Sequence, residues 1–218
     1  MTRRVVRSEG VVLAGPAGKL EALVDSAGSQ PRAIAVVCHP HPLQHGTMQN
    51  KVVTTLVRAF VDLGAHCLRF NFRGVGASEG GFGDGIGERD DARTAVTWAR
   101  ERWPGLPLYL GGFSFGAAIA LSIAAEVRPK GLVTVAPPVD KLPPDFVPPE
   151  CPWLLVHGAA DDVVRVDATA AWVETLTVRP RSVVLEGVGH FFHGRLLHLA
   201  ETVRSFFETD FPVAKTSS

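Results

Sequence analysis

A serine stands at the centre of Gly112-Phe113-Ser114-Phe115-Gly116, between an apolar run and an alanine-rich run. The apolar run, residues 108–111, is typical of a buried parallel strand, and the alanine-rich run predicts a helix that starts near Ala117. A chain that turns so sharply strains its central residue, and glycines two positions away on each side lack the Cβ atoms that would collide. The spacing favours an accessible nucleophile, Ser114; the alternative is a turn that glycine merely softens.

A serine hydroxyl is a weak nucleophile, so it needs a base within hydrogen-bond reach. We expect this base to be His190, which directly follows the predicted strand 182–186 in a loop with two glycines. Those glycines would let the loop carry the imidazole across the end of the sheet. The rivals His193 and His198 fall on the predicted helix 192–207, where a surface or packing role is the simpler interpretation.

The base in turn needs an acid that holds its orientation. Asp161 is our candidate, because it follows the predicted strand 153–157. Its neighbour Asp162 is the immediate rival, and Asp140 is a more distant one. One of the two adjacent aspartates would cap the turn or the next helix while the other serves the site. Either choice gives the chain order Ser, Asp, His that is typical of such elbows.

The segment His39-Pro40-His41-Pro42-Leu43 follows another predicted strand and could help to bind an oxyanion. A tetrahedral intermediate needs a second backbone N–H besides that of Phe115. Since proline has no N–H, only His41, Leu43 and the more remote Gln44 can supply it. We prefer His41 and keep Leu43 as the alternative.

Two other kinds of chemistry are conceivable at this segment. His39, His41 and His45 lie close enough in sequence to suggest a metal site, but the intervening prolines hinder a compact ligand face. Cys38 could suggest a thiol nucleophile, yet it lies inside an apolar run and is more typical of a core position. We therefore expect neither a metal nor any other cofactor.

The elements that would position these residues follow one another in a regular order. After an N-terminal hairpin at residues 4–13 and 20–25, strands are predicted at 33–38, 66–70, 108–111, 131–135, 153–157 and 182–186, and helices at 47–63, 88–103, from 117, at 166–177 and at 192–207. This alternation predicts an α/β fold, a mainly parallel sheet with helices on both faces. Chemistry then gathers at the carboxyl ends of the strands. The proline-rich residues 137–152 predict an irregular connection, not a cap domain.

Composition limits the class of protein. The chain has 218 residues, 46% of them hydrophobic, with Lys plus Arg and Asp plus Glu equal at 22 each. We expect one domain, residues 1–211, followed by a flexible C-terminal tail, residues 212–218. The charge balance argues against nucleic acid or an anionic membrane as partner. Three scattered cysteines and no signal-like start favour a reduced, cytoplasmic protein.

These motifs together resemble the α/β-hydrolase superfamily, and within it a small lidless group. In that group a His-Pro-His-Pro loop precedes a Gly-Thr-Met-x-Asn-Lys segment, here residues 39–42 and 46–51. The resemblance continues in residues 71–78 and 157–161 and covers nearly the whole chain. It departs at His45-Gly46, where relatives often carry paired glycines. The resemblance implies a serine hydrolase of esterase or thioesterase type, with Ser114, Asp161 and His190 as its triad.

The function expected on these grounds is hydrolysis of a small carboxylic ester or thioester through an acyl-enzyme. An uncapped site would be open and shallow, with short acyl chains lying against Phe113, Phe115, Leu43 and Phe191. A peptidase or haloperoxidase-like activity is the alternative among enzymes, because one triad serves several chemistries. A non-catalytic binding protein that keeps the fold is the alternative outside enzymes. The oligomeric state is open.

Overall fold

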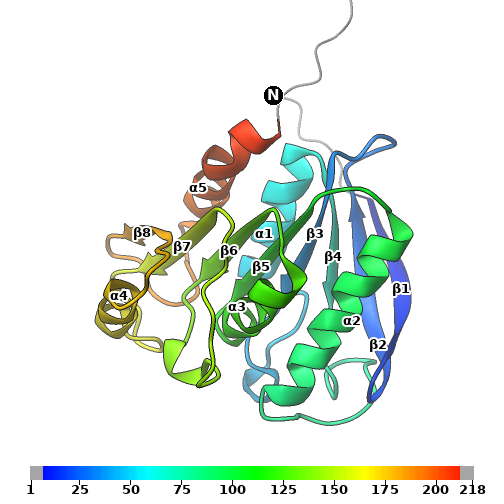
Figure 1. The fold of residues 1–218 in the computed structure, drawn as a ribbon, viewed down its shortest axis with the longest axis horizontal. Helices are drawn as coiled ribbons and strands as arrows, with labels where there is room; N and C mark the ends of the chain where they lie inside the picture. The colour runs from blue at the N-terminus through cyan, green and yellow to red at the C-terminus, as the bar shows by residue number, and fades with distance from the viewer. Residues whose placement is uncertain (1–6, 212–218) are drawn as a thin grey trace, which may run out of the picture.

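A mixed eight-stranded sheet forms the middle layer of the protein in a computed structural model that describes residues 7–211 (Figure 1). The strands lie in the order β1-β2-β4-β3-β5-β6-β7-β8. Their bounds are β1 Arg7–Gly15, β2 Gly18–Ser26, β3 Ala33–Cys38, β4 Ala65–Phe70, β5 Leu108–Phe113, β6 Gly131–Val135, β7 Trp153–Gly158 and β8 Arg181–Leu185. The helices are α1 Lys51–Leu63, α2 Ile86–Arg102, α3 Phe115–Val127, α4 Val166–Glu174 and α5 Leu196–Phe207, with 3-10 turns η1 Pro42–Gln44, η2 Val139–Lys141 and η3 Glu208–Asp210.

The strand directions confirm the predicted fold class. The N-terminal hairpin β1-β2 is antiparallel and joins β4 in an antiparallel pair, whereas the pairs from β4 through β3, β5, β6 and β7 to β8 are parallel. Arg4, the expected first residue of the hairpin, and the predicted tail, residues 212–218, lie outside the described residues. The single domain at residues 1–211 stays a prediction.

Helices cover both faces of this sheet (Figure 1). On one face α1 packs against α5, and on the other α2 packs against α3. Residues alternate between the two faces along a strand. In β3, accordingly, Ala33, Ala35 and Val37 join the core of α1 and α5, while Ile34 and Val36 join the core of α2 and α3. Burial on both faces explains why this strand reads as an unbroken apolar run.

Four helix starts differ from the sequence prediction. Helix α2 begins at Ile86 instead of residue 88, and the other three differences have a local reason. Helix α1 begins at Lys51 because the Asn50 side chain accepts a hydrogen bond from the Val52 N–H and caps it. Helix α3 begins at Phe115, since the preceding serine already closes the turn. Helix α5 begins at Leu196 instead of residue 192, because Phe192 has a φ of 53° and cannot continue a right-handed helix.

The segments that follow the carboxyl ends of the strands gather at the lower edge of the sheet in Figure 1. They include the turn η1 after β3, the long loop between β4 and α2, and the turn η2 after β6. Residues 137–152 hold only the short turn η2 and are otherwise irregular, as predicted. No helix within residues 7–211 is long and apolar enough to cross a membrane.

Candidate active site

Ser114 occupies a strained turn between β5 and α3. Its backbone has a φ of 53° and a ψ of −124°, a conformation that residues with a Cβ atom rarely adopt. The surroundings hold it there, because its N–H donates to the Val135 carbonyl at 2.8 Å and its own carbonyl accepts from Ala117 and Ala118 at the start of α3. The hydroxyl is thus fixed at the positive end of a helix.

The two flanking glycines are required by contact with backbone atoms. A Cβ atom on Gly112 would lie 2.2 Å from the Gly116 carbonyl oxygen. A Cβ atom on Gly116 would lie 2.4 Å from the carbonyl oxygens of both Cys38 and His39. The elbow therefore packs directly on the end of β3, where the predicted oxyanion loop begins.

Replacing Gly116 by alanine is expected to destabilise the protein by about 1–3 kcal/mol, the usual cost of forcing extra atoms into a packed site. The obstructing atoms belong to backbone carbonyls and cannot rotate away. Gly10→Ala is the matched control, because a Cβ atom there meets nothing within 4 Å. Urea unfolding compares the two variants. Equal midpoints for Gly116→Ala and the wild type would contradict the close packing of Gly116 on the Cys38 and His39 carbonyls.

The three predicted triad residues meet above the elbow. His190 Nε2 lies 3.0 Å from Ser114 Oγ, and His190 Nδ1 lies 2.7 Å from Asp161 Oδ2. Ser114 and His190 are 8% and 4% exposed, so the contacts are shielded from bulk water. The rivals His193 and His198 are exposed. The prediction that His193 lies on a helix is wrong, because helix α5 starts after it, at Leu196.

Asp161 both caps the turn and contacts the histidine. We expected one of the two adjacent aspartates to cap the turn and the other to serve the site, but Asp161 does both. Its Oδ1 accepts the N–H groups of Val163 and Val164 at 2.9 and 2.8 Å, while Oδ2 faces His190. Burial raises the pKa of Asp161, but hydrogen bonds from His157, His190 and the two backbone groups outweigh it and hold the pKa well below the usual range. The carboxylate is therefore ionised at neutral pH.

The segment after β3 favours one of the two proposed oxyanion donors. The Leu43 N–H donates to His41 Nδ1 at 3.2 Å, and the Gln44 N–H donates to the His41 carbonyl at 3.0 Å. Among the turn and loop hydrogen bonds of residues 7–211, neither the His41 N–H nor the Phe115 N–H takes part. The Leu43 N–H is thus already bonded within the loop, and Leu43 is 69% exposed.

His39 fixes this segment from below. Its Nε2 accepts the Phe72 N–H at 3.0 Å, so Nδ1 carries the proton and donates to the Pro40 carbonyl at 2.6 Å. Burial lowers the pKa of His39 to about 4, against the opposing effect of the Pro40 bond. A buried, neutral ring with both nitrogens engaged is a structural cross-link. Among residues 7–211, no group of three His, Cys, Asp or Glu side chains is placed to hold a metal.

The departure at His45-Gly46 is readily accommodated. A Cβ atom on Gly46 would lie 2.0 Å from the Pro40 carbonyl oxygen, so glycine is required there. His45 adopts a φ of 58°, which a residue with a Cβ atom can occupy at a cost of roughly 1–2 kcal/mol. Only the second of the paired glycines is thus essential to the shape of the loop.

A cavity of about 670 Å³ opens beside Ser114 and extends along α3 to Ser122. Its volume and its reach to Ser122 are larger than expected of the shallow site that the sequence suggested. Its walls are mostly apolar and include Phe82, Phe115, Ala118, Ile119, Pro138, Val139, Val163 and Val164, next to His41. Charged residues at the cavity are Asp84, Arg89, Asp140, Lys141 and Arg165. His190 is not among the described residues that line it.

Phe113 does not form the acyl wall that we expected. It is fully buried and stacks against the imidazole of His190, with ring centroids 4.8 Å apart. Leu43 and Phe191 also lie outside the described lining, and both are exposed. Of the expected wall residues, Phe115 alone lines the cavity among the residues described.

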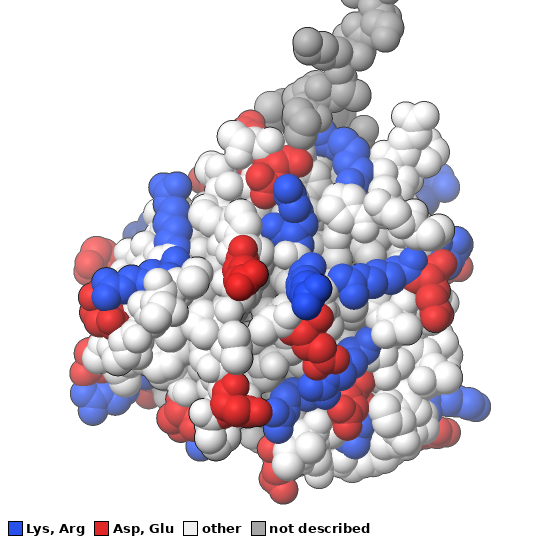
Figure 2. All heavy atoms as spheres, viewed as in Figure 1, with Lys and Arg blue, Asp and Glu red and all other residues white. Residues whose placement is uncertain are grey.

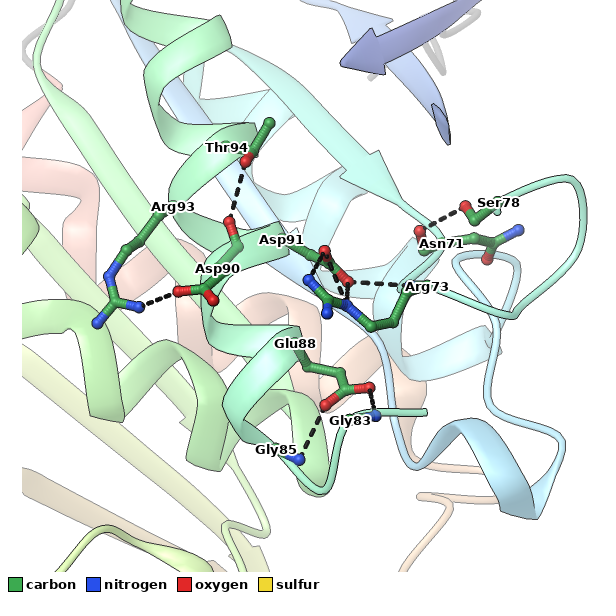
Figure 3. Close-up of polar contacts among 10 residues, drawn as sticks. All are labelled: Asn71, Arg73, Ser78, Gly83, Gly85, Glu88, Asp90, Asp91, Arg93 and Thr94. Atoms are coloured by element: carbon green, nitrogen blue, oxygen red, sulfur yellow. Dashed lines mark hydrogen bonds and ion pairs between the residues drawn. The ribbon is translucent and has the colours of Figure 1, made fainter. Parts of the chain in front are cut away.

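A polar network that the sequence did not reveal supports the cavity rim (Figure 3). Arg73 forms a bidentate ion pair with Asp91 of α2, and the Asp91 carboxylate also accepts the Arg73 N–H at 3.0 Å. The buried Glu88 carboxylate accepts the N–H groups of Gly83 and Gly85 at 2.9 and 2.8 Å. These bonds hold the loop that carries Phe82 into the cavity.

Two further features singled out in the sequence are the surface charge and the thiol of Cys38. Figure 2 shows acidic and basic side chains interspersed over one face, without a broad area of a single sign among the residues drawn in colour. The rival nucleophile Cys38 is buried, and burial raises the pKa of its thiol to about 12. It therefore stays protonated and unreactive at neutral pH.

Solved structures share this architecture. XC6422 from Xanthomonas campestris, described as an α/β serine hydrolase without a lid, is 39% identical with a TM-score of 0.90, covering 95% of this chain and 97% of that one. Est1E from Butyrivibrio proteoclasticus, solved with ferulic acid bound, has a TM-score of 0.78 at 19% identity, covers 91% and 98% of the two chains, and shares the fold alone. The fold and the site together define a lidless α/β serine hydrolase.

The family follows from the sequence matches. Residues 29–150 match the family described as Serine aminopeptidase, S33. An uncharacterized protein of Rickettsia prowazekii, RP471, is 34% identical over 207 residues, covering 89% of this chain and 87% of its own. The chain belongs to this serine hydrolase family. Membership of the narrower group with a His-Pro-His-Pro loop stays a prediction.

Proposed function

We propose that the protein hydrolyses small carboxylic esters or thioesters through an acyl-enzyme on Ser114. One observation carries the proposal: the unbroken contact from Ser114 Oγ to His190 Nε2 at 3.0 Å, and from His190 Nδ1 to Asp161 Oδ2 at 2.7 Å. Both distances are within hydrogen-bond range, and the nucleophile sits on a strained elbow at a helix start. No cofactor takes part in the proposed reaction.

In the proposed mechanism His190 takes the proton of Ser114 as Oγ attacks the acyl carbonyl. Asp161 holds the imidazole in the required tautomer and stabilises its charged form. His190 then donates the proton to the leaving alcohol or thiol, which departs as the carbonyl re-forms. A water molecule, deprotonated by His190, attacks the acyl-enzyme and releases the carboxylic acid and the free serine.

The oxyanion of each tetrahedral intermediate would be bound by the N–H groups of Phe115 and His41. Both are outside the turn and loop hydrogen bonds described above, whereas the Leu43 N–H is engaged by the His41 ring. We therefore retain His41 and withdraw Leu43 as the donor. Preorganised donors of this kind stabilise developing charge without reorganisation.

The cavity would receive the acyl part of the substrate. His190 must reach the leaving group, yet it is absent from the described lining, while Ser114 and Phe115 belong to it. Helix α3 rises about 1.5 Å per residue, so the cavity runs about 12 Å along the axis from Ser114 to Ser122. An apolar chain of medium length fits this space better than an acetyl group.

A series of nitrophenyl esters tests this assignment. We expect kcat/KM to rise from acetate to a maximum at hexanoate or octanoate and then to fall. Ser122→Phe would fill the far end of the cavity and move the maximum to shorter chains, while Ser122→Ala would leave it in place. A maximum at acetate, or an unchanged preference in Ser122→Phe, would contradict the acyl pocket. Cleavage of peptide amides without any ester cleavage would favour the peptidase alternative.

A further inference from the structure

His157 lies beside the proposed triad without a part in it. It is the last residue but one of β7 and is completely buried. Its Nε2 lies 3.0 Å from the Val164 carbonyl oxygen and 3.3 Å from Asp161 Oδ2. The same carboxylate oxygen faces His190 Nδ1 at 2.7 Å. Two histidines therefore share one oxygen of Asp161.

The carbonyl of Val164 decides the tautomer of His157. A carbonyl can only accept a hydrogen bond, so Nε2 must carry the proton. That N–H then points between the Val164 carbonyl and the Asp161 carboxylate. The other nitrogen, Nδ1, is buried and has no hydrogen-bond partner among the described residues. A hydrogen on Nδ1 would bury an unpaired donor, which is costly, so Nε2 is the nitrogen that donates.

The carboxylate of Asp161 therefore faces four hydrogen-bond donors. Oδ1 accepts two backbone N–H groups, from Val163 and Val164, and Oδ2 accepts one donor from each histidine. Rotation about the side-chain torsion would break at least one of these bonds. The contact to His157 is the longer of the two at Oδ2, so it shares the negative charge without displacing His190.

We infer that His157 is a positioning residue for the hydrolysis, whose Nε2–H orients the Asp161 carboxylate and moderates its hold on His190. This inference rests on the proposed function. Without the Nε2–H of His157, Oδ2 would face His190 alone, and the Asp161 carboxylate would lose one of the four donors that orient it. His190 would then face a more negative carboxylate oxygen and be less well aimed at Ser114.

A packing role is the alternative, and two substitutions separate it from the inferred one. His157→Phe keeps the ring volume and removes the donor. His157→Gln places an amide N–H at a reach similar to that of Nε2. If packing alone matters, the phenylalanine variant is the better replacement. If the donor matters, the glutamine variant is.

The test measures kcat and KM for nitrophenyl hexanoate across pH, with thermal unfolding to confirm folding. We expect His157→Phe to lower kcat by about tenfold to a hundredfold, as for one lost hydrogen bond to a charged group, with KM little changed. The acid limb of its kcat/KM profile moves to higher pH, because His190 is then the one side-chain donor left to the Asp161 carboxylate among the described residues. The other two donors are the backbone N–H groups of Val163 and Val164. His157→Gln keeps kcat and the acid limb close to those of the wild type.

Three outcomes would overturn the inference. The first is a His157→Phe variant with wild-type kcat and pH profile, and the second is a His157→Gln variant impaired as strongly as the phenylalanine one. Should His157→Phe fail to fold, His157→Asn replaces it, because its shorter amide does not reach Asp161; wild-type kinetics in that variant would be the third. If these outcomes accompany serine-dependent ester hydrolysis, the proposed function stands, whereas a wild type without esterase activity removes both proposals.

Discussion

Ser114→Ala should lower kcat for ester hydrolysis by roughly a millionfold, the scale seen when a triad nucleophile is removed. The reason is that, among residues 7–211, His190 Nε2 contacts Ser114 Oγ and no other nucleophile, and the Cys38 thiol is buried and protonated. Steady-state hydrolysis of nitrophenyl hexanoate checks this, with Ser182→Ala on the exposed face of β8 as a matched control.

The folded state should survive this change. Alanine fits the space of serine, and the hydroxyl of Ser114 takes no part in the backbone hydrogen bonds that fix the elbow. A further variant, Ser114→Gly, relieves the positive φ and is expected to raise the free energy of unfolding by about 1 kcal/mol. Residual hydrolysis within tenfold of the wild type in either variant would contradict the assignment of the nucleophile.

Asp161→Asn should lower kcat by about ten-thousandfold, the effect of presenting an amide to the histidine of such a triad. The amide can favour the wrong tautomer of His190, and it no longer stabilises the charged ring. Asp162→Asn is the matched control, because Asp162 is the adjacent, exposed aspartate. Equal losses in the two variants would show that the distinction between the adjacent aspartates is wrong.

The same pair has a second readout in stability against pH. The pKa of Asp161 is lowered in the folded protein, so its contribution to stability is present above the unfolded pKa and is lost as the pH falls through the folded one. Acid should therefore destabilise the wild type and Asp162→Asn more steeply than Asp161→Asn. Urea midpoints from neutral pH down to acid conditions measure this difference.

Much of the site could be predicted because parallel strands end at one edge of a sheet. Ser114, Asp161 and His190 each follow a strand whose apolar run is plain in the sequence, so topology alone brings them together. The elbow glycines, Gly112 and Gly116, indicate the strained turn. All these signals are local in sequence, and the alternation of strands and helices was enough to predict the fold class.

What could not be predicted depends on which way a side chain points. Phe113 and Phe115 flank the nucleophile, but Phe113 ends a strand and enters the core of α1 and α5, whereas Phe115 begins a helix and enters the core of α2 and α3. Only the second lines the cavity. His157 was missed for a similar reason, because a histidine inside an apolar strand gives no sign that its Nε2 meets an aspartate in the next turn.

The most direct test of Ser114 as the activated nucleophile is mass spectrometry of the intact protein after treatment with a fluorophosphonate. We expect one adduct per chain, mapped by peptide digestion to Ser114 and formed at neutral pH. Ser114→Ala should form none, and Asp161→Asn should form it far more slowly than Asp162→Asn. A folded wild type that stays unlabelled, or an adduct on any other residue, would contradict the proposal that Ser114 is the activated nucleophile of this hydrolase.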